Sequence, residues 1–326
     1  MSRPGAAPER VLVIAHTGRE RTLQAVVAVV SALARAGVDV VVGEEQAPML
    51  DAAMRSADVA GGFRAVPTDA DGAPEAHVLD SVDLVLVLGG DGTILRAAEI
   101  VRGSRAALLG VNLGHVGFLA ESELEGLTDT VARLLAGDYD VEERMTIDVR
   151  VLDNGDCDEN GTGRLVAATW ALNEVAVEKA SRQRMLEIVL EVDGRPLTRF
   201  GCDGIVTATP TGSTAYAFSA GGPVVWPEVE AMLVVPLSAH ALFARPLVVG
   251  TSSVVAVETV PALGGPGVLW ADGRRSVDLP ELARVEVRRG EAPVRLARLS
   301  ATGFTERLVQ RFRLPVTGWR GPRGGL

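Results

Sequence analysis

Blocks of apolar residues alternate with amphipathic segments along the first 136 residues. The pattern predicts strands at 11–15, 38–42, 82–88 and 106–111, and helices at 21–35, 93–102 and 123–136. Gly37 is expected to end the first helix. Strands that alternate with helices are typical of βαβ units, so this part of the chain is predicted to form an α/β domain with a parallel sheet.

After residue 141 the pattern changes to short apolar strands separated by turns. Strands are expected at 145–152, 165–177, 186–192, 204–208, 247–249, 253–260, 268–271 and 284–288. Asp193-Gly194 predicts a two-residue hairpin. The polar stretch 153–163 has the carboxylates of a calcium loop, but it lacks the EF-hand spacing and flanking helices, so we expect a solvated hairpin loop. This half is predicted to be antiparallel and rich in β-structure.

Length and composition narrow the class of protein. A chain of 326 residues, 47 % of them hydrophobic, is long enough for two domains of about 150 residues each. The formal net charge of −10 argues against nucleic acid or an anionic membrane as a partner. Cys157 and Cys202 provide neither a disulfide framework nor a thiolate zinc site. Because no secretory signal and no apolar run of membrane-spanning length is present, a cytoplasmic location is expected.

The sequence Gly89-Gly90-Asp91-Gly92-Thr93 follows the apolar run 82–88 directly. Glycines after a buried strand let the backbone turn and expose its N–H groups, which suits phosphate binding. A carboxylate beside a phosphate holds a metal or accepts a proton from an attacking hydroxyl, so the pairing indicates phosphoryl transfer. An ordinary strand-to-helix turn is the alternative. Asp91 and Asn112 both follow predicted parallel strands, where such sheets bind ligands.

A second segment rich in hydroxyl groups runs from Thr209 to Tyr216 and follows Asp203-Gly204 after a short apolar strand. Its proline and glycine predict a tight loop, and Tyr216 offers a ring for stacking on a base. A β-turn with a packed tyrosine is the alternative. Lys179 is the only lysine, which excludes a phosphate loop of the Gly-x-x-x-x-Gly-Lys type, and no Gly-x-Ser-x-Gly elbow of a serine hydrolase is present.

Taken together, these segments resemble the NAD kinase family, actinobacterial members in particular. The resemblance rests on segments 89–93, 112–119, 173–174, 200–204, 209–216 and 220–223, and on the ending 312–319. The Gly-Gly-Asp-Gly-Thr turn is shared with diacylglycerol and sphingosine kinases, and phosphofructokinases have a similar turn. The resemblance therefore implies a Rossmann-like N-terminal domain, similar to diacylglycerol kinases and phosphofructokinases, at 1–138. It also implies a β-rich NAD-binding domain at 139–300, and a segment 301–326 with a helix at 305–313 that completes the first domain.

The implied reaction phosphorylates the 2′-hydroxyl of the adenosine ribose of NAD, giving NADP. ATP with Mg²⁺ is the expected donor, inorganic polyphosphate is an alternative donor, and no metal ligand is assigned to the protein. Asp91 matches the proton acceptor of the family. The phosphate donor is expected at Gly89, Gly90, Gly92 and Thr93. NAD is expected at Asp91, Gly92, Arg96, Asn173, Glu174, Arg184, Asp203, Thr214, Ala215, Tyr216, Ala217, Phe218, Ser219 and Arg274. A homodimer or homotetramer is also implied.

This chain departs from the commoner family pattern at Gly201-Cys202, where many members carry arginine and serine, so one cationic NAD contact is missing or replaced. His115 is interpreted as a supporting or surface residue, and His240 either packs in the core or lies near the nicotinamide end. A lipid kinase would share Asp91 but should present a membrane-binding segment. An NAD sensor would not need Asp91. The arginines beyond residue 295 suggest nucleic acid, although we prefer the closing helix.

Overall fold

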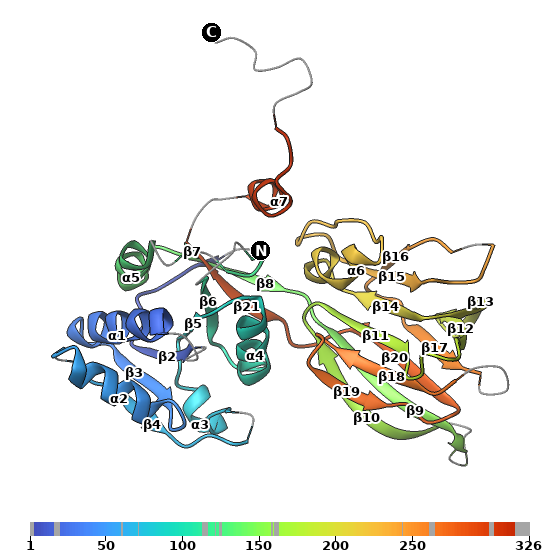
Figure 1. Ribbon diagram of the computed structural model, residues 1–326, viewed down its shortest axis with the longest axis horizontal. Helices are drawn as coiled ribbons and strands as arrows, with labels where there is room; N and C mark the ends of the chain where they lie inside the picture. The colour runs from blue at the N-terminus through green and yellow to red at the C-terminus, as the bar shows by residue number, and fades with distance from the viewer. Residues whose placement is uncertain are drawn as a thin grey trace, which may run out of the picture. The chain divides into compact units, whose positions relative to one another are not determined.

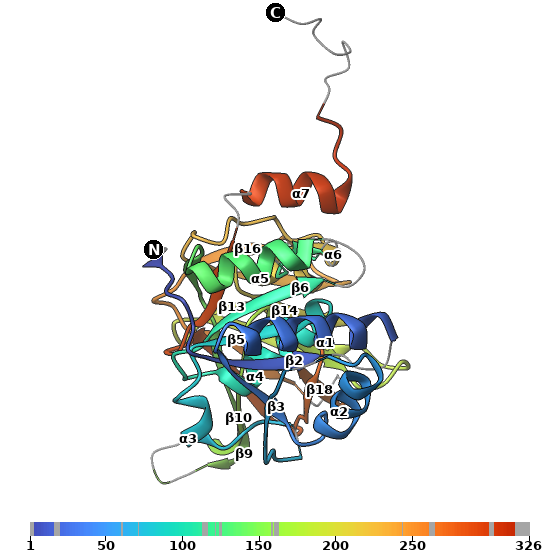
Figure 2. The same ribbon diagram turned by 90° about the vertical axis from the view of Figure 1, so that its left-hand side faces the viewer.

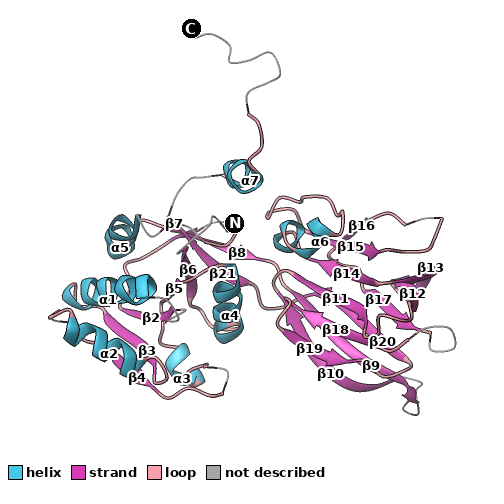
Figure 3. Cartoon of the chain, viewed as in Figure 1, coloured by secondary structure: helices cyan, strands magenta, loops and turns pink. Residues whose placement is uncertain are grey.

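The computed structural model describes residues 3–15, 20–59, 61–70, 72–112, 117–120, 122–123, 126–157, 159, 163–242, 244–260, 265–299 and 303–316. The chain divides into two compact units (Figure 1). Unit 1 contains Met1–Glu143 and Val294–Leu326, and unit 2 contains Arg144–Pro293. Among the described residues, all the α-helices except α6 belong to unit 1, whereas unit 2 consists mainly of strands (Figure 3).

Unit 1 is built on a nine-stranded sheet in the order β1-β8-β21-β6-β5-β2-β3-β4, with β7 beside β6. Its strands are β1 (Arg3–Pro4), β2 (Arg10–Ala15), β3 (Asp39–Gly43), β4 (Arg64–Val66), β5 (Leu84–Leu88), β6 (Ala107–Asn112), β7 (Ser122–Glu123), β8 (Asp140–Arg144) and β21 (Val294–Arg298). The neighbouring strands in the run β6-β5-β2-β3-β4 are parallel, and β7 and β21 are each parallel to β6. Strands β1 and β8 are antiparallel. The predicted parallel sheet is confirmed.

Helices cover both faces of this sheet. The described helices of unit 1 are α1 (Glu20–Arg35), α2 (Ala47–Ser56), α3 (Ala76–Leu79), α4 (Asp91–Val101), α5 (Leu127–Ala136) and α7 (Phe304–Phe312), and α7 lies beyond the edge of the sheet (Figures 1 and 2). Figure 2 shows α1 and α5 side by side along the sheet, and their apolar residues share a core with Val11 and Val13. The opposite face packs against α4, where Gly110 of β6 leaves room for the Ile94 side chain.

Unit 2 contains two six-stranded antiparallel sheets, β10-β9-β20-β17-β12-β13 and β16-β15-β14-β11-β18-β19. The first contains β9 (Ile147–Cys157), β10 (Gly163–Ala171), β12 (Leu186–Val192), β13 (Arg195–Cys202), β17 (Val255–Thr259) and β20 (Ala283–Arg289). The second contains β11 (Glu174–Lys179), β14 (Gly204–Ala208), β15 (Ala231–Leu237), β16 (Leu247–Gly250), β18 (Gly267–Ala271) and β19 (Arg275–Asp278). A buried apolar cluster joins residues of both sheets. A turn of 3₁₀-helix, Thr211–Thr214, and the short helix α6 (Tyr216–Ser219) follow β14.

The predicted antiparallel character of unit 2 is confirmed, as is the hairpin at Asp193-Gly194, whose two residues have φ of 53° and 70°. The polar stretch 153–163 joins the paired strands β9 and β10, as expected of a hairpin. The single strand predicted at 165–177 is wrong, because the chain passes from β10 in one sheet to β11 in the other near Leu172. Helix α5 begins at Leu127 rather than at 123, since β7 occupies Ser122–Glu123.

Candidate functional site

The glycine turn lies between β5 and α4, as the sequence predicts. Gly90 is the N-terminal cap of α4 in an extended conformation, and Asp91 is the first residue of the helix. The Gly89 N–H donates to Val111 O at 3.0 Å, and the Thr93 N–H donates to Gly90 O at 2.9 Å. Two of the amides expected to bind phosphate therefore already have backbone partners, one on β6 and one within the turn. The amides between them begin α4, where a helix has unpaired N–H groups and a positive dipole end.

The carboxylate of Asp91 contacts a chain segment that follows β6. It accepts hydrogen bonds from the backbone N–H groups of Phe118 and Leu119, each at 3.3 Å. A Cβ atom on Gly117 would lie 2.2 Å from Asp91 Oδ1, so only glycine fits beside this carboxylate. Asn112 is buried at the end of β6, the parallel neighbour of β5. Residues 113–116, which include His115, lie outside the described part of the chain.

Arg96 lies on α4, half-buried, and reaches the loop around Gly72. A Cβ atom on Gly72 would meet the Arg96 Nη2 atom at 2.4 Å and Glu45 Oε1 at 3.4 Å. Gly72 has a φ of 79°, which a glycine adopts without strain. The Arg96 guanidinium therefore packs against this loop, within the same unit as Asp91.

In unit 2, Asn173 and Glu174 are buried at the start of β11 and are held by an aspartate that the sequence analysis did not single out. The Asp272 carboxylate accepts the N–H groups of Leu172, Asn173 and Glu174 at 2.9, 2.7 and 3.3 Å, and it forms an ion pair with Arg275 at 3.1 Å. Burial raises its pKa, although these four partners favour the ionised form. The available signal was the Asp272-Gly273 pair, which forms the turn between β18 and β19.

Hydroxyl groups in the loop after β14 hold the loop itself. Thr209 Oγ1 donates to Leu172 O at 2.5 Å and accepts the Gly212 N–H at 3.1 Å. Thr214 Oγ1 donates to Thr211 O at 3.2 Å. A Cβ atom on Gly212 would lie 2.0 Å from the carbonyl oxygen of Asn173, so the loop packs directly on that backbone. The hydroxyl-rich sequence therefore has a structural role in binding the loop to residues 172–173.

A cavity of about 320 Å³ lies along β11. It is lined by Glu174, Ala176, Glu178, Tyr216, Trp270 and Gly273. The first three alternate along the strand and therefore share one face. Tyr216 lies along the same face of β11, because its backbone N–H donates to Glu174 Oε2 at 3.3 Å and its hydroxyl group forms a hydrogen bond with Glu178. The sequence analysis missed Trp270, whose only signal was its place at an outward position of β18.

Two ionisable side chains that line this cavity, Glu174 and Tyr216, have raised pKa values. Burial raises the pKa of Glu174 to about 8, and the neighbouring Asp272 charge adds to the shift. The shift favours the protonated form of Glu174, which can donate a hydrogen bond as well as accept one. Desolvation and the Glu178 carboxylate raise the pKa of Tyr216 to about 12. The cavity thus offers two rings and two carboxyl groups.

The other residues predicted to bind NAD differ in their exposure to solvent. Within α6, Ala217 is fully buried, whereas Phe218 is 39 % exposed and Ser219 is exposed; Thr214 and Ala215 before the helix are half-buried. Arg274 is exposed and follows the cavity residue Gly273. Arg184 is exposed and packs beside Gly265, which does not line the cavity.

Asp203 lies beyond the Glu178 end of β11. It forms an ion pair with Lys179, and that contact lowers its pKa. Its charge also reaches Tyr216, whose pKa it helps to raise. The backbone N–H of His240 donates to Gly201 O at 2.8 Å. His240 is exposed, so the interpretation as a core histidine is wrong. Gly201 is buried, and a Cβ atom there would lie 3.1 Å from Met185 Cε.

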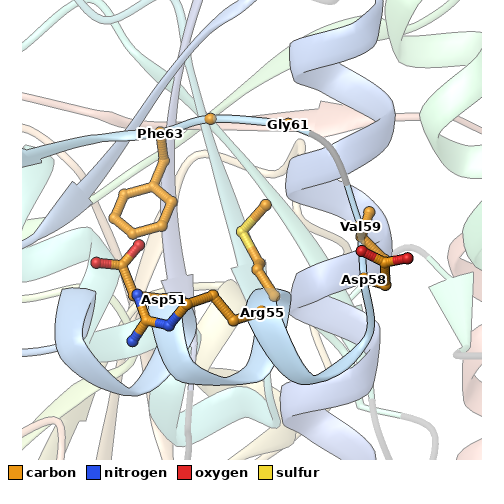
Figure 4. Close-up of a pocket in the computed structure, with 8 residues that line it drawn as sticks. Asp51, Arg55, Asp58, Val59, Gly61 and Phe63 are labelled. Carbon is orange, nitrogen blue, oxygen red and sulfur yellow. The ribbon is translucent and has the colours of Figure 1, made fainter.

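A second cavity, of about 470 Å³, opens beside α2 in unit 1 (Figure 4). It is lined by Asp51, Met54, Arg55, Asp58, Val59, Gly61, Gly62 and Phe63. Although it is larger than the cavity along β11, none of the predicted site residues borders it. We therefore place the candidate site at Asp91 in unit 1 and at the β11 cavity in unit 2.

Within the described ranges, no three histidine, cysteine or acidic side chains are grouped so that they could hold a metal ion. None of the helices in the described part of the chain combines the length and apolar character needed to cross a membrane.

Comparison with known proteins gives consistent matches. Residues 11–139 match the ATP-NAD kinase N-terminal domain, and residues 172–299 match the ATP-NAD kinase C-terminal domain. An NAD kinase of Leifsonia xyli is 58 % identical over 98 % of this chain and 99 % of its own length. NAD kinase 2 of Streptomyces coelicolor is 56 % identical over 95 % of this chain and 96 % of its own.

Solved structures match the fold. Yeast NADH kinase, crystallised with NADH, has a TM-score of 0.80 at 22 % identity, over 97 % of this chain and 89 % of its own. An NAD kinase of Archaeoglobus fulgidus in complex with ATP has a TM-score of 0.59 at 24 % identity, over 88 % of this chain and 92 % of its own. At these identities the similarity establishes the fold alone.

Proposed function

Because the chain belongs to the NAD kinase family, we propose that it transfers the terminal phosphoryl group of ATP to the 2′-hydroxyl of the adenosine ribose of NAD, giving NADP. The observation that carries the proposal is the place of the Asp91 carboxylate at the first turn of α4. A helix N-terminus there can bind phosphate, and the same turn supplies an acceptor for a proton. Phosphoryl transfer needs both of these, because the attacking hydroxyl is a weak nucleophile.

Asp91 is the proposed proton acceptor. Two backbone N–H groups fix its carboxylate, so its oxygens keep one orientation while the hydroxyl of NAD attacks. The amides of Gly90, Asp91 and Gly92 are the proposed contacts of the donor phosphates, with Gly89 and Thr93 shaping the turn. Mg²⁺ bound to the phosphates of ATP would neutralise part of their charge. Inorganic polyphosphate carries the same terminal phosphoryl group and is a second proposed donor.

NAD is proposed to occupy the cavity along β11. The rings of Tyr216 and Trp270 are suited to contact with a planar base, and Glu174 in its protonated form can both donate to and accept from ribose or base groups. Asn173 has the same dual capacity. Arg274, on the adjoining turn, is the proposed contact of a phosphate or ribose. In this scheme unit 1 binds the phosphate donor, unit 2 binds NAD, and the chain acts in the cytoplasm as a homodimer or homotetramer.

The test is incubation of the protein with NAD, Mg²⁺ and either ATP or polyphosphate, with NADP as the readout. Asp91→Asn should lower kcat by about 10² or more while NAD still binds, because the amide cannot accept the proton. Asp51→Asn, an exposed aspartate on α2, is the matched control and should retain activity. A wild-type kcat in Asp91→Asn would remove Asp91 from this role, and absence of NADP with either donor would refute the proposed reaction.

A further inference from the structure

We propose that residues 117–120, called here the amide clamp, position the carboxylate of Asp91, and that Arg307 of α7 is a positioning residue for the reaction because it holds this clamp. The inference rests on the proposed role of Asp91 as proton acceptor. It gives a function to residues 117–119 of the segment 112–119, which the sequence analysis singled out without assigning it chemistry, and to the closing helix Phe304–Phe312.

The clamp contacts both oxygens of the carboxylate. The Phe118 N–H donates to Oδ2 and the Leu119 N–H donates to Oδ1, so two consecutive amides define the plane of the group. At 3.3 Å these bonds are long, and their value lies in orientation more than in strength. Gly117 permits the approach, since a Cβ atom there would lie 2.2 Å from Oδ1 and 2.7 Å from Cγ.

Side chains from the last two elements of unit 1 hold the clamp. Arg307 Nη1 donates to the carbonyl oxygen of Ala120 at 3.0 Å, and Arg298 Nη1 of β21 donates to that of Leu119 at 3.4 Å. The Phe118 ring contacts the rings of Phe304 and Phe312 on α7, at centroid distances of 6.1 and 5.7 Å.

The burial of Arg307 argues for more than coverage of an apolar surface. Arg307 is only 9 % exposed, although a charged side chain is costly to bury and an apolar residue would fill the same space. Its hydrogen bond to the carbonyl oxygen of Ala120 fixes the distance between the clamp and α7. Phe118 and Leu119 donate to Asp91 through their N–H groups, while the Phe118 ring contacts α7 and the Leu119 carbonyl accepts from Arg298 of β21. Arg307 of α7 holds the next residue, Ala120, so a shift of α7 displaces the carboxylate.

A displaced base slows the chemical step without weakening substrate binding. Misplacement by about 1 Å can cost on the order of 10² in rate. The expected signature is therefore a lower kcat with nearly unchanged KM values for NAD and ATP. A helix with a merely structural role would instead lower the fraction of folded protein and the melting temperature, with no change in the kcat of the molecules that remain folded.

The experiment compares Gly117→Ala, Arg307→Gln and Arg307→Lys in the full-length chain. The kcat of each variant is normalised to the NAD-binding stoichiometry measured by isothermal titration calorimetry, so that unfolded protein does not count. We expect Gly117→Ala and Arg307→Gln to lower the normalised kcat at least about tenfold, with KM values within about threefold of wild type. Arg307→Lys keeps the charge and a donor, and should recover part of the loss.

Two controls match these variants. Gly62→Ala adds a methyl group where no atom lies within 4 Å, and Gln310→Ala changes an exposed position of α7. Both should retain the wild-type kcat. A normalised kcat within twofold of wild type in Arg307→Gln and Gly117→Ala would overturn the inference, as would losses confined to KM. If Asp91→Asn, measured in the same series, retains activity, the proposed proton acceptor is wrong, whereas an inactive Asp91→Asn beside fully active clamp variants refutes the clamp alone.

Discussion

Replacement of Asp272 by asparagine should destabilise unit 2 and weaken NAD binding together. Oδ1 of Asp272 accepts the amides of Asn173 and Glu174, and Oδ2 accepts the amide of Leu172 and the Arg275 guanidinium. An asparagine side chain has one oxygen and one NH₂ group. In either orientation its NH₂ group therefore faces two N–H donors, which lose their acceptor inside a buried site.

The magnitude follows from those two lost bonds. A buried donor left without a partner costs about 1–3 kcal/mol, so two of them predict a loss of about 3 kcal/mol in the free energy of unfolding. For a domain of about 150 residues this lowers the melting temperature by roughly 6–12 °C. The KM for NAD should rise as well, because the substitution loosens the backbone that carries Asn173 and Glu174.

Tryptophan fluorescence can follow this transition, since Trp170, Trp226 and Trp270 all lie in unit 2. Urea or thermal unfolding of Asp272→Asn would be compared with Asp278→Asn, an exposed aspartate on the adjacent β19. The control should differ little from wild type. A change below 1 kcal/mol in Asp272→Asn, or one equal to that of the control, would show that the three amides are not held by this carboxylate.

Three further predictions concern the same unit. The pKa of Glu174 is raised from 4.5 to about 8 in the folded state, so its contribution to stability is complete below pH 4.5 and is lost as the pH rises through 8. Glu174→Gln should flatten this decline in the free energy of unfolding, measured with urea at each pH. Parallel pH profiles for the variant and the wild type would contradict the prediction. In steady-state assays, Tyr216→Ala should raise the KM for NAD about tenfold and leave the KM for ATP nearly unchanged, with Tyr216→Phe as the control. Equal increases in both KM values would argue against this location of NAD. Gly212→Ala, whose Cβ would lie 2.0 Å from Asn173 O, should cost at least about 3 kcal/mol or prevent folding, whereas Gly250→Ala should melt like wild type.

Features that depend on neighbouring residues were predictable from the sequence. The strand that leads to the glycine turn is buried on both faces, so it appears as an unbroken apolar run, and a Cβ atom on Gly89 would meet the side chain of Thr93 only four residues later. The hairpin at Asp193-Gly194 is similarly local. The closing helix was predicted from the family resemblance and is confirmed as Phe304–Phe312.

Features that depend on distant residues were not predictable. Asp272 holds amides about a hundred positions earlier in the chain, and nothing near it indicates that partnership. The same distance explains the error over 165–177, because the apolar pattern continues while the backbone passes to another sheet at the point where Asp272 binds it. Sequence also could not show that the Thr209 hydroxyl bonds to the chain, since a hydroxyl can serve a ligand equally well.

The position of β21 has a consequence for biosynthesis. This strand lies between β8 and β6 in the sheet of unit 1, yet it is the last strand to leave the ribosome. Unit 2 is continuous in sequence and can complete its sheets first, while the sheet of unit 1 waits for residues beyond 293. Premature termination shortly before β21 would therefore leave unit 2 with all of its residues, and would leave a gap in the sheet of unit 1, most of whose residues are translated before those of unit 2.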